Sequence, residues 1–236
     1  MQYLTELHAH TATVSPCADM QPEDTAQRYI DAGYTTVVVT DHYCDYVIDP
    51  VEGGWEDKIR HYVSGYKKMK EYAKDKLHIL LGCELRFLQN HNDYLVFGMD
   101  EDFLLNHPNL HQMKLRTFSE LARANGLLVV QAHPFRNGMT VMPPKYLDGV
   151  EVFNGHPHHD SRNDLANTWA KRYGLIRTSG SDFHHPHSVE AGGIITDVPV
   201  TSMGQLVQIL RSGSYTLRCQ GPAAARDGMT DMPAKY

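Results

Sequence analysis

Five histidines and two carboxylates stand at or just after short apolar runs of this sequence, and together they could bind metal ions. They are His8, His10, His42, Glu84, His133, Asp182 and His184. Nitrogen and oxygen ligands in this number exceed the needs of one ion and suit two or three divalent cations such as Mn²⁺, Zn²⁺ or Fe²⁺. The set contains no thiol, which argues against a closed structural zinc site of the cysteine type. Paired ions can activate a water and clamp both oxygens of an in-line displacement, so the set indicates hydrolysis, most naturally of a phosphate ester.

The elements that position these side chains are short aliphatic runs alternating with amphipathic helical patterns. After a first strand that carries His8 and His10, we expect strands at 35–40, 79–84, 94–97, 127–131, 149–153, 175–178 and 193–196. Alternating β and α elements favour a mostly parallel α/β sheet, open or closed into a barrel. At least six strands end in a histidine, a carboxylate or an amide. Because the carboxyl ends of parallel barrel strands face one mouth, we expect an active site there.

The motifs come in a recognisable order along the chain. They read His8-x-His10-Thr11, Thr40-Asp41-His42, Gly82-Cys83-Glu84, Ala132-His133-Pro134 and Ser181-Asp182-x-His184. This ordered set resembles the polymerase-and-histidinol-phosphatase (PHP) superfamily over most of the chain, from the first strand to Asp197. The resemblance implies an α/β fold, a distorted (β/α)7 TIM-like barrel of PHP type. It also implies a metal-dependent phosphoesterase, although some relatives in polymerases have lost part of the ligand set.

The resemblance further implies three metal positions. The first takes His8, His10, Glu84 and Asp182, the second takes Glu84 and His133, and the third takes His42 and His184.

Two positions depart from the family pattern. Where the second ion usually takes a histidine a few residues before a glycine, this chain has Asp93, which can still be a ligand, with His91 as the alternative. Where the third ion usually takes a histidine or aspartate, the segment offers Cys17 or Asp19, or the third site is weak or empty. Two tightly held ions are therefore expected, and the third stays open.

Substrate binding and catalysis need further groups at the same mouth. Arg136 and Arg86 follow two of the ligand motifs closely, and a guanidinium fork suits phosphate oxygens. We therefore expect both to bind substrate, with a surface or ion-pair role as the alternative for each. Catalysis is assigned to Asp182, which holds metal, and to His42 or His184, which would protonate the leaving group.

A second group of polar residues surrounds the expected strand 149–153. His156, His158 and His159 follow Asn154 at the expected mouth, so they contact substrate or belong to a solvated loop. Glu151 alternates away from Asn154 on the strand, and we expect it to be structural.

The leading interpretation is a phosphoesterase that hydrolyses a small phosphate ester with a metal-activated water. The alternatives are a histidinol-phosphate phosphatase, or a nucleotide phosphatase or nuclease, because no residue specifies the rest of the substrate. A non-catalytic metal-binding PHP domain is the alternative from a different class. The number of expected buried ionisable groups argues against it, since burying them has no physical use without bound metal.

Composition limits the remaining possibilities. The net charge is −6 and no long run of one sign occurs, which argues against a long nucleic acid partner or a basic membrane anchor. The opening residues lack a secretory pattern, no apolar stretch approaches a membrane span, and the four cysteines show no C-x-x-C spacing. We expect a cytoplasmic protein with one domain over 1–220 and a C-terminal tail over 221–236, whose oligomeric state the sequence does not specify.

Overall fold

Two six-stranded sheets with helices packed around them form the fold of residues 2–235, which this computed structural model describes. The strands are β1 (Tyr3–Ala9), β2 (Thr36–Val39), β3 (His42–Tyr43), β4 (His78–Leu81), β5 (Cys83–Arg86), β6 (Asp93–Phe97), β7 (Leu128–Gln131), β8 (Gly149–Asn154), β9 (Ile176–Gly180), β10 (Ile194–Thr196), β11 (Thr216–Leu217) and β12 (Met232–Pro233). The helices are α1 (Pro22–Asp31), α2 (Asp45–Ile48), α3 (Trp55–Tyr62), α4 (Ser64–Ala73), α5 (Glu101–Asn106), η1 (Leu110–Gln112), α6 (Leu115–Ala124), η2 (Pro144–Tyr146), α7 (Asn163–Tyr173), α8 (Met203–Ser212) and α9 (Gly221–Asp227). All the strands expected from the sequence are present within a few residues of their predicted bounds.

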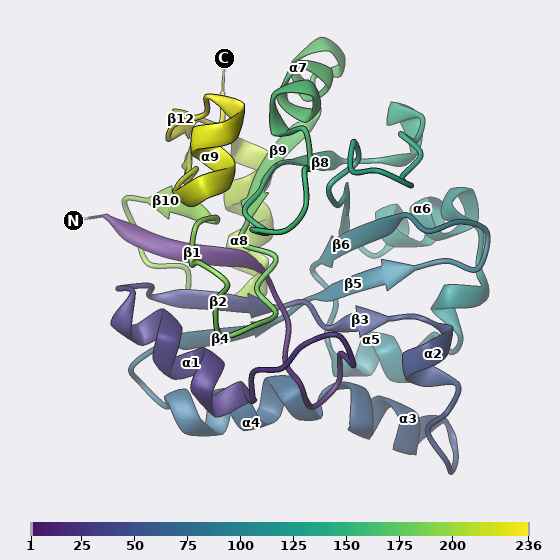
Figure 1. The fold of residues 1–236 in the computed structure, drawn as a ribbon. Helices are drawn as coiled ribbons and strands as arrows, with labels where there is room; N and C mark the ends of the chain where they lie inside the picture. Colours follow the sequence, from purple (N-terminus) through teal and green to yellow (C-terminus); the bar gives the residue numbers. More distant parts are fainter. Residues whose placement is uncertain (1, 236) are drawn as a thin grey trace.

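The chain passes from the first sheet to the second at two places, where one strand ends and another begins after one or two residues. The first sheet has the order β12-β11-β10-β1-β2-β4 and the second has the order β3-β5-β6-β7-β8-β9. The chain leaves β2 through Thr40 and Asp41 to enter β3, and it leaves β4 through Gly82 to enter β5 (Figure 1). The expected strand 79–84 is therefore two strands, and its second half delivers Glu84 into the second sheet.

A closed barrel is not formed by the hydrogen-bonded strands of residues 2–235. Following the breaks, the strands succeed one another around a ring in which β9 lies beside β1 without a hydrogen-bonded ladder, and an isolated bridge joins Ala9 to Phe183, just after β9. The expectation of an α/β fold is confirmed, whereas the closure expected of a TIM-like barrel is absent. The reason lies in the residues after β9, which leave the strand conformation as soon as they reach the mouth: Asp182 has a positive φ of 52°.

Strand β6 runs against both of its neighbours, which a mostly parallel sheet does not predict. It pairs antiparallel with β5 and with β7, and its register places Asp93 opposite Arg86. Because its direction is reversed, the first residue of β6 lies at the end of the sheet where β5 and β7 finish. Asp93 thus reaches the mouth from the start of its strand.

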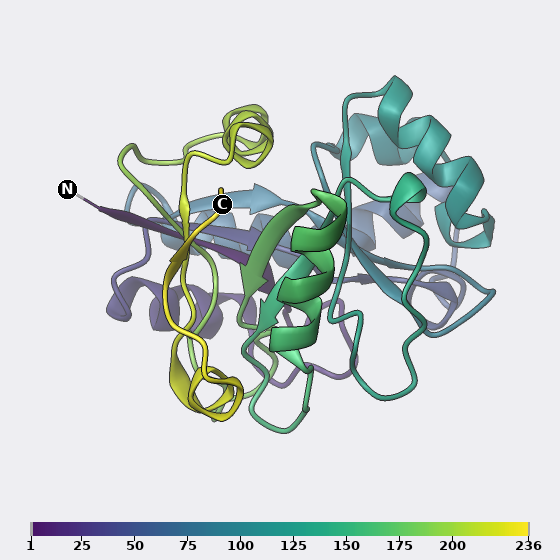
Figure 2. The same cartoon turned by 90° about the horizontal axis from the view of Figure 1, so that it is seen from above.

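The helices cover the outer faces of the sheets through apolar stripes. In α6 the buried residues Leu115, Phe118, Ser119 and Ala122 recur at helical spacing and pack toward the core. Helices α1 and α4 lie side by side against the first sheet, and α7 lies along β8 and β9 (Figures 1 and 2). None of the described helices is both long and apolar enough to cross a membrane.

The segment expected to be a C-terminal tail is instead part of the fold. Residues 221–227 form α9, in which Ala223 and Ala224 are buried, and β12 pairs antiparallel with β11 at the edge of the first sheet. The buried Arg177 donates hydrogen bonds to the carbonyl oxygens of Pro233 and Ala234. The sequence signal was weak because alanine and a two-residue strand give little periodicity, while the contacts that hold them are made by distant β9 and β11.

We expect Gly82→Ala to destabilise the protein by about 1–3 kcal/mol, the usual cost of overpacking. A Cβ at this position would lie 2.6 Å from Val38 Cγ1 and 3.0 Å from Thr40 Cγ2, at the joint between β4 and β5. Urea unfolding measures the change. Gly204→Ala in α8 is the matched control, because its Cβ meets nothing within 4 Å and alanine favours a helix. Equal midpoints for the two variants would contradict the prediction.

Candidate metal centre

All eight predicted metal ligands come together at the mouth where β1, β2, β5, β7 and β9 end and β3 and β6 begin. They are His8, His10, His42, Glu84, Asp93, His133, Asp182 and His184, and each is at most 7% exposed. Most of them line a cavity of about 350 Å³ together with Cys17, Arg86, Arg136 and the outer histidines His156, His158, His159 and His185. A larger cavity of about 470 Å³ beside α4 and the start of α8 contains none of the predicted ligands.

The carboxylate of Glu84 occupies the middle of the group. Its Oε1 lies 3.2 Å from His8 Nε2 and 3.3 Å from His133 Nε2, and its Oε2 lies 2.9 Å from His42 Nδ1 and 3.3 Å from His10 Nε2. Burial would raise the pKa of Glu84, but the charges of His8 and His42 hold it well below its usual value. A buried anion that contacts four imidazoles from three segments of the chain can bridge two cations.

Hydrogen bonds behind the first two histidines fix which ring nitrogen faces the centre. His8 donates its Nδ1–H to Glu151 Oε1 at 2.8 Å. The hydroxyl of Ser15 has one proton, which it donates to Asp41 at 2.7 Å. In the 3.2 Å contact between Ser15 Oγ and His10 Nδ1, the imidazole is therefore the donor. In both rings Nδ1 therefore carries a proton, so each ring, when neutral, presents the lone pair of Nε2 to a ligand.

The Nε2 atoms of the two rings face each other, an arrangement that a shared proton or a bound metal ion stabilises. His8 Nε2 and His10 Nε2 are 3.1 Å apart. Two ligand atoms bound to one ion lie about 3.0–3.4 Å apart at ordinary metal–nitrogen distances, so this spacing fits a shared ion. Burial disfavours charge on His8, yet Glu151, Asp182 and Glu84 raise its pKa well above the usual value. Carboxylates that attract a proton to this position also attract a metal ion.

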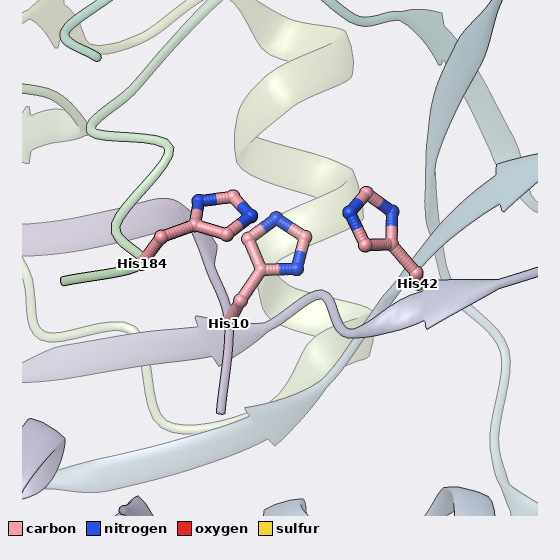
Figure 3. A group of neighbouring side chains, drawn as sticks. All are labelled: His10, His42 and His184. Atoms are coloured by element: carbon pink, nitrogen blue, oxygen red, sulfur yellow. The ribbon is translucent and has the colours of Figure 1, made fainter. Parts of the chain in front are cut away.

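A second side of the centre consists of His10, His42 and His184, whose rings stand next to one another (Figure 3). Their centroids are 4.1 Å apart for His10 and His184 and 4.6 Å for His10 and His42. Each can offer a nitrogen within 4.8 Å of the other two. Burial, His184 and His42 lower the pKa of His10 well below the usual value, so His10 is neutral and able to ligate. Two further sets in residues 2–235 meet the same spacing: His8, His10 and Asp182, and His42, Glu84 and Asp93.

Of the two residues expected near the third position, Cys17 lies closer to the centre. Cys17 lines the cavity with His42 and His184. Burial raises its pKa, but hydrogen bonds with His184 and His42 outweigh burial and lower the pKa to about 6. Cys17 and Asp19 are both exposed, but Asp19 is not among the residues that line the cavity and accepts a 2.8 Å hydrogen bond from His185 Nδ1.

Asp93 rather than His91 lies at the centre, and it is tied to an arginine. His133 Nε2 is 3.8 Å from Asp93 Oδ2, whereas His91 is exposed and lines a separate groove. Arg86 donates Nε–H and Nη2–H to the two oxygens of Asp93 at 2.7 and 2.8 Å. The fork of Arg86 therefore positions a candidate ligand, which leaves Arg136 as the stronger candidate for binding substrate.

Asp182 and His133 hold left-handed backbone conformations directly after their strands. Their φ values are 52° and 29°. Non-glycine residues adopt such conformations at a cost of about 1–3 kcal/mol, which the surrounding structure must offset. At His133 the backbone N–H donates to Glu151 Oε2 at 3.0 Å, and at Asp182 the carboxylate accepts from Arg136 at 2.7 Å.

Sequence reasoning missed Glu151, which lies directly behind the centre. Its carboxylate accepts hydrogen bonds from His8 Nδ1, the His133 backbone N–H and Asn154 Nδ2. We expected Glu151 and Asn154 on opposite faces, but the pairing of β8 with β9 shifts register between Glu151 and Phe153. This irregularity breaks the alternation and turns both toward the mouth. A carboxylate inside the apolar run GVEVF was the available signal, because burying it requires partners.

The outer histidines divide by burial. His156 is buried at 6% exposure, and burial with the nearby charge of Arg136 lowers its pKa to about 3. His158 and His159 are exposed at the rim, and His185 is intermediate. His156 is thus the most buried member of this group, with its ring 5.8 Å from that of His184.

Comparison with known proteins finds a family and a set of similar folds for this chain. The PHP domain family model matches residues 6–216. Among solved structures, a two-domain protein from Bacteroides vulgatus containing a predicted PHP-like metal-dependent phosphoesterase aligns with TM-score 0.68 and 15% identity, over 93% of this chain and 65% of that one. PsfC from Pseudomonas syringae aligns with TM-score 0.62 and 16% identity, over 87% and 88%. Endonuclease Q, in complex with a 27-mer duplex with an abasic lesion at the active site, aligns with TM-score 0.64 and 13% identity, over 91% and 58%.

These identities show a shared fold, and the chain spans about two thirds of the length of the Bacteroides protein. No curated protein sequence matches the chain.

We expect Glu151→Gln to weaken binding of the first metal ion about 10–100-fold, the usual effect of losing a carboxylate behind a ligating histidine. Competition with a chromophoric chelator measures the affinity, and circular dichroism checks the fold. Glu120→Gln on the exposed face of α6 is the control and should leave affinity unchanged. Unchanged affinity in both variants would remove Glu151 from the centre.

Proposed function

Because the chain belongs to the PHP domain family, we propose that it is a metal-dependent phosphoesterase acting on a small phosphate ester. The observation that carries the proposal is the buried pair of imidazole nitrogens, His8 Nε2 and His10 Nε2, which lie 3.1 Å apart and face the Glu84 carboxylate. The arrangement fits a cation and serves no evident purpose without one. A cavity of about 350 Å³ suits a small ester.

The ligands divide into overlapping sets around Glu84. In this proposal His8, His10 and Asp182 hold one ion with Glu84, and His133 and Asp93 hold the second. Bound divalent ions, Mn²⁺, Zn²⁺ or Fe²⁺, lower the pKa of a water and neutralise charge on the phosphoryl oxygens.

The remaining side chains of the cavity handle the substrate. Arg136 offers guanidinium N–H groups to phosphoryl oxygens, while Asp182 holds that guanidinium in place at 2.7 Å. His42 and His184 line the same cavity. With a third ion bound they are ligands, and without one either can pass a proton to the leaving oxygen.

Two further substrate types and one non-enzymatic role belong to the same proposal as its alternatives. A phosphodiester, in a nuclease or a related enzyme, is the second candidate, because Endonuclease Q shares the fold. Against a long nucleic acid stand the net charge of −6 and the small cavity. Histidinol phosphate and nucleotides are the small esters to test first, and a metal-binding domain without catalysis is the alternative to any enzyme.

The deciding experiment assays metal-loaded protein on an aryl phosphomonoester, on a bis-aryl phosphodiester and on a duplex with an abasic lesion. We expect chelator-sensitive turnover of the monoester. Asp182→Asn should reduce turnover about 100-fold or more, since it removes a ligand carboxylate and the partner of Arg136.

Asp102→Asn, on an exposed turn of α5, is the matched control and should leave turnover unchanged. Cleavage of the diester or the duplex faster than the monoester would indicate a phosphodiesterase instead. Full metal occupancy without turnover of any phosphoester would contradict the enzyme and favour the metal-binding domain.

We also propose that Cys17, not Asp19, completes the third metal position beside His42 and His184. A thiolate ligand favours softer ions, Zn²⁺ or Fe²⁺, over Mn²⁺. Loading with Co²⁺ should produce a near-ultraviolet thiolate-to-metal absorption band in the wild type and in Asp19→Asn. The band should disappear in Cys17→Ser, and its persistence there would exclude Cys17 as a ligand.

A further inference from the structure

The side-chain oxygen of Asn154 anchors two groups on the same wall of the cavity. Asn154 Oδ1 accepts a 2.8 Å hydrogen bond from Arg136 Nη2 and a 3.1 Å hydrogen bond from the backbone N–H of His156. Its amide nitrogen donates to Glu151 and to Asp182, so the orientation of Oδ1 is determined. Arg136 and His156 are therefore placed together, next to the metal centre, by one buried side chain.

The imidazole of His156 is a neutral hydrogen-bond donor in this arrangement. Its Nδ1 accepts the backbone N–H of His158 at 3.2 Å, and a ring nitrogen that accepts carries no proton. The proton of the neutral ring is thus on Nε2. No described residue accepts a hydrogen bond from this Nε2–H, and the ring lines the cavity. His156 consequently cannot ligate a metal through Nε2 in the usual way, but it can donate to an anion.

Arg136 also has donors left over. Only Nη2 bonds to described residues, namely Asp182, Asn154 and Ser161. Its Nε is buried without a partner in a side chain that is 14% exposed. A buried unpaired guanidinium donor is costly, and an oxyanion at the cavity wall would satisfy it.

We infer that Arg136 and His156 form the subsite that binds the non-bridging oxygens of the phosphoryl group. The guanidinium supplies charge-assisted donors, and the Nε2–H of His156 supplies a neutral donor from the adjacent loop. Their position beside Asp182 and His184 places the bound oxygens at the edge of the metal centre. This inference rests on the proposed phosphoesterase function and assigns the residues that bind its substrate.

The test measures binding of inorganic phosphate to metal-loaded protein by calorimetry, together with kinetics on an aryl phosphomonoester. His156→Ala should weaken phosphate binding about 3–10-fold, as expected for one lost hydrogen bond, and should raise KM by a similar factor. Metal content should stay unchanged, because His156 is not a ligand. His156→Gln, which keeps an N–H donor, should recover part of the binding.

His158→Ala is the matched control, because it keeps the backbone N–H that orients His156 and removes only an exposed imidazole at the rim. Its phosphate affinity should equal that of the wild type. Equal affinity of wild type and His156→Ala would overturn the subsite and leave the phosphoesterase intact. Phosphate binding that depends on His156 without turnover of any ester would support the subsite and reject the enzymatic function. Loss of metal in His156→Ala would overturn the inference, since His156 would then act on the centre itself.

Discussion

Imidazole nitrogens buried side by side next to a carboxylate govern the arrangement of this protein. His8 and His10 use Nδ1 to donate to Glu151 and Ser15, so their Nε2 atoms approach each other at 3.1 Å beside the Glu84 carboxylate. Buried ionisable groups at this spacing need protons or a bound metal ion to balance their charges. The hydrogen bonds that fix the protons therefore prepare a site before any ion arrives, and metal binding should contribute to the stability of the fold.

The strand geometry follows from bringing these groups to one point. The breaks at Thr40–Asp41 and at Gly82 redirect the chain so that His42 and Glu84 sit on the second sheet, while His8 and His10 stay on the first. The left-handed residues His133 and Asp182 then turn ligands inward where a regular strand would continue. Of the five non-glycine residues with positive φ in the described chain, these two lie at the centre, where strain that function retains is expected.

The sequence could predict the elements and ligands whose signals are local, and it could not predict those set by distant contacts. The His-x-His spacing and the polar residues at strand ends predicted which side chains come together. These signals are local, because each can be recognised within one short segment of the sequence. The reversed direction of β6 is set by its pairing with β5 and β7. The sequence could therefore name Asp93 as a ligand but could not show why it lies at the mouth. The irregular register in β8 reversed the expected face of Glu151, and only the pairing with β9 shows it. The choice between Cys17 and Asp19 likewise needed the fold, since both lie in one loop and only one lines the cavity.

The short strand β12 also affects how this protein behaves toward other copies of itself. An open sheet edge is a template for pairing with any extended chain, and natural proteins protect such edges. Here the last strand of the first sheet is two residues long and contains Pro233, which has no N–H to offer a further strand. The guanidinium of Arg177 donates hydrogen bonds to the carbonyl oxygens of Pro233 and Ala234, so these acceptors are not available to a further strand. Trimming the C-terminus at residue 221 would thus expose β11 and favour self-association, and expression vectors should retain these residues.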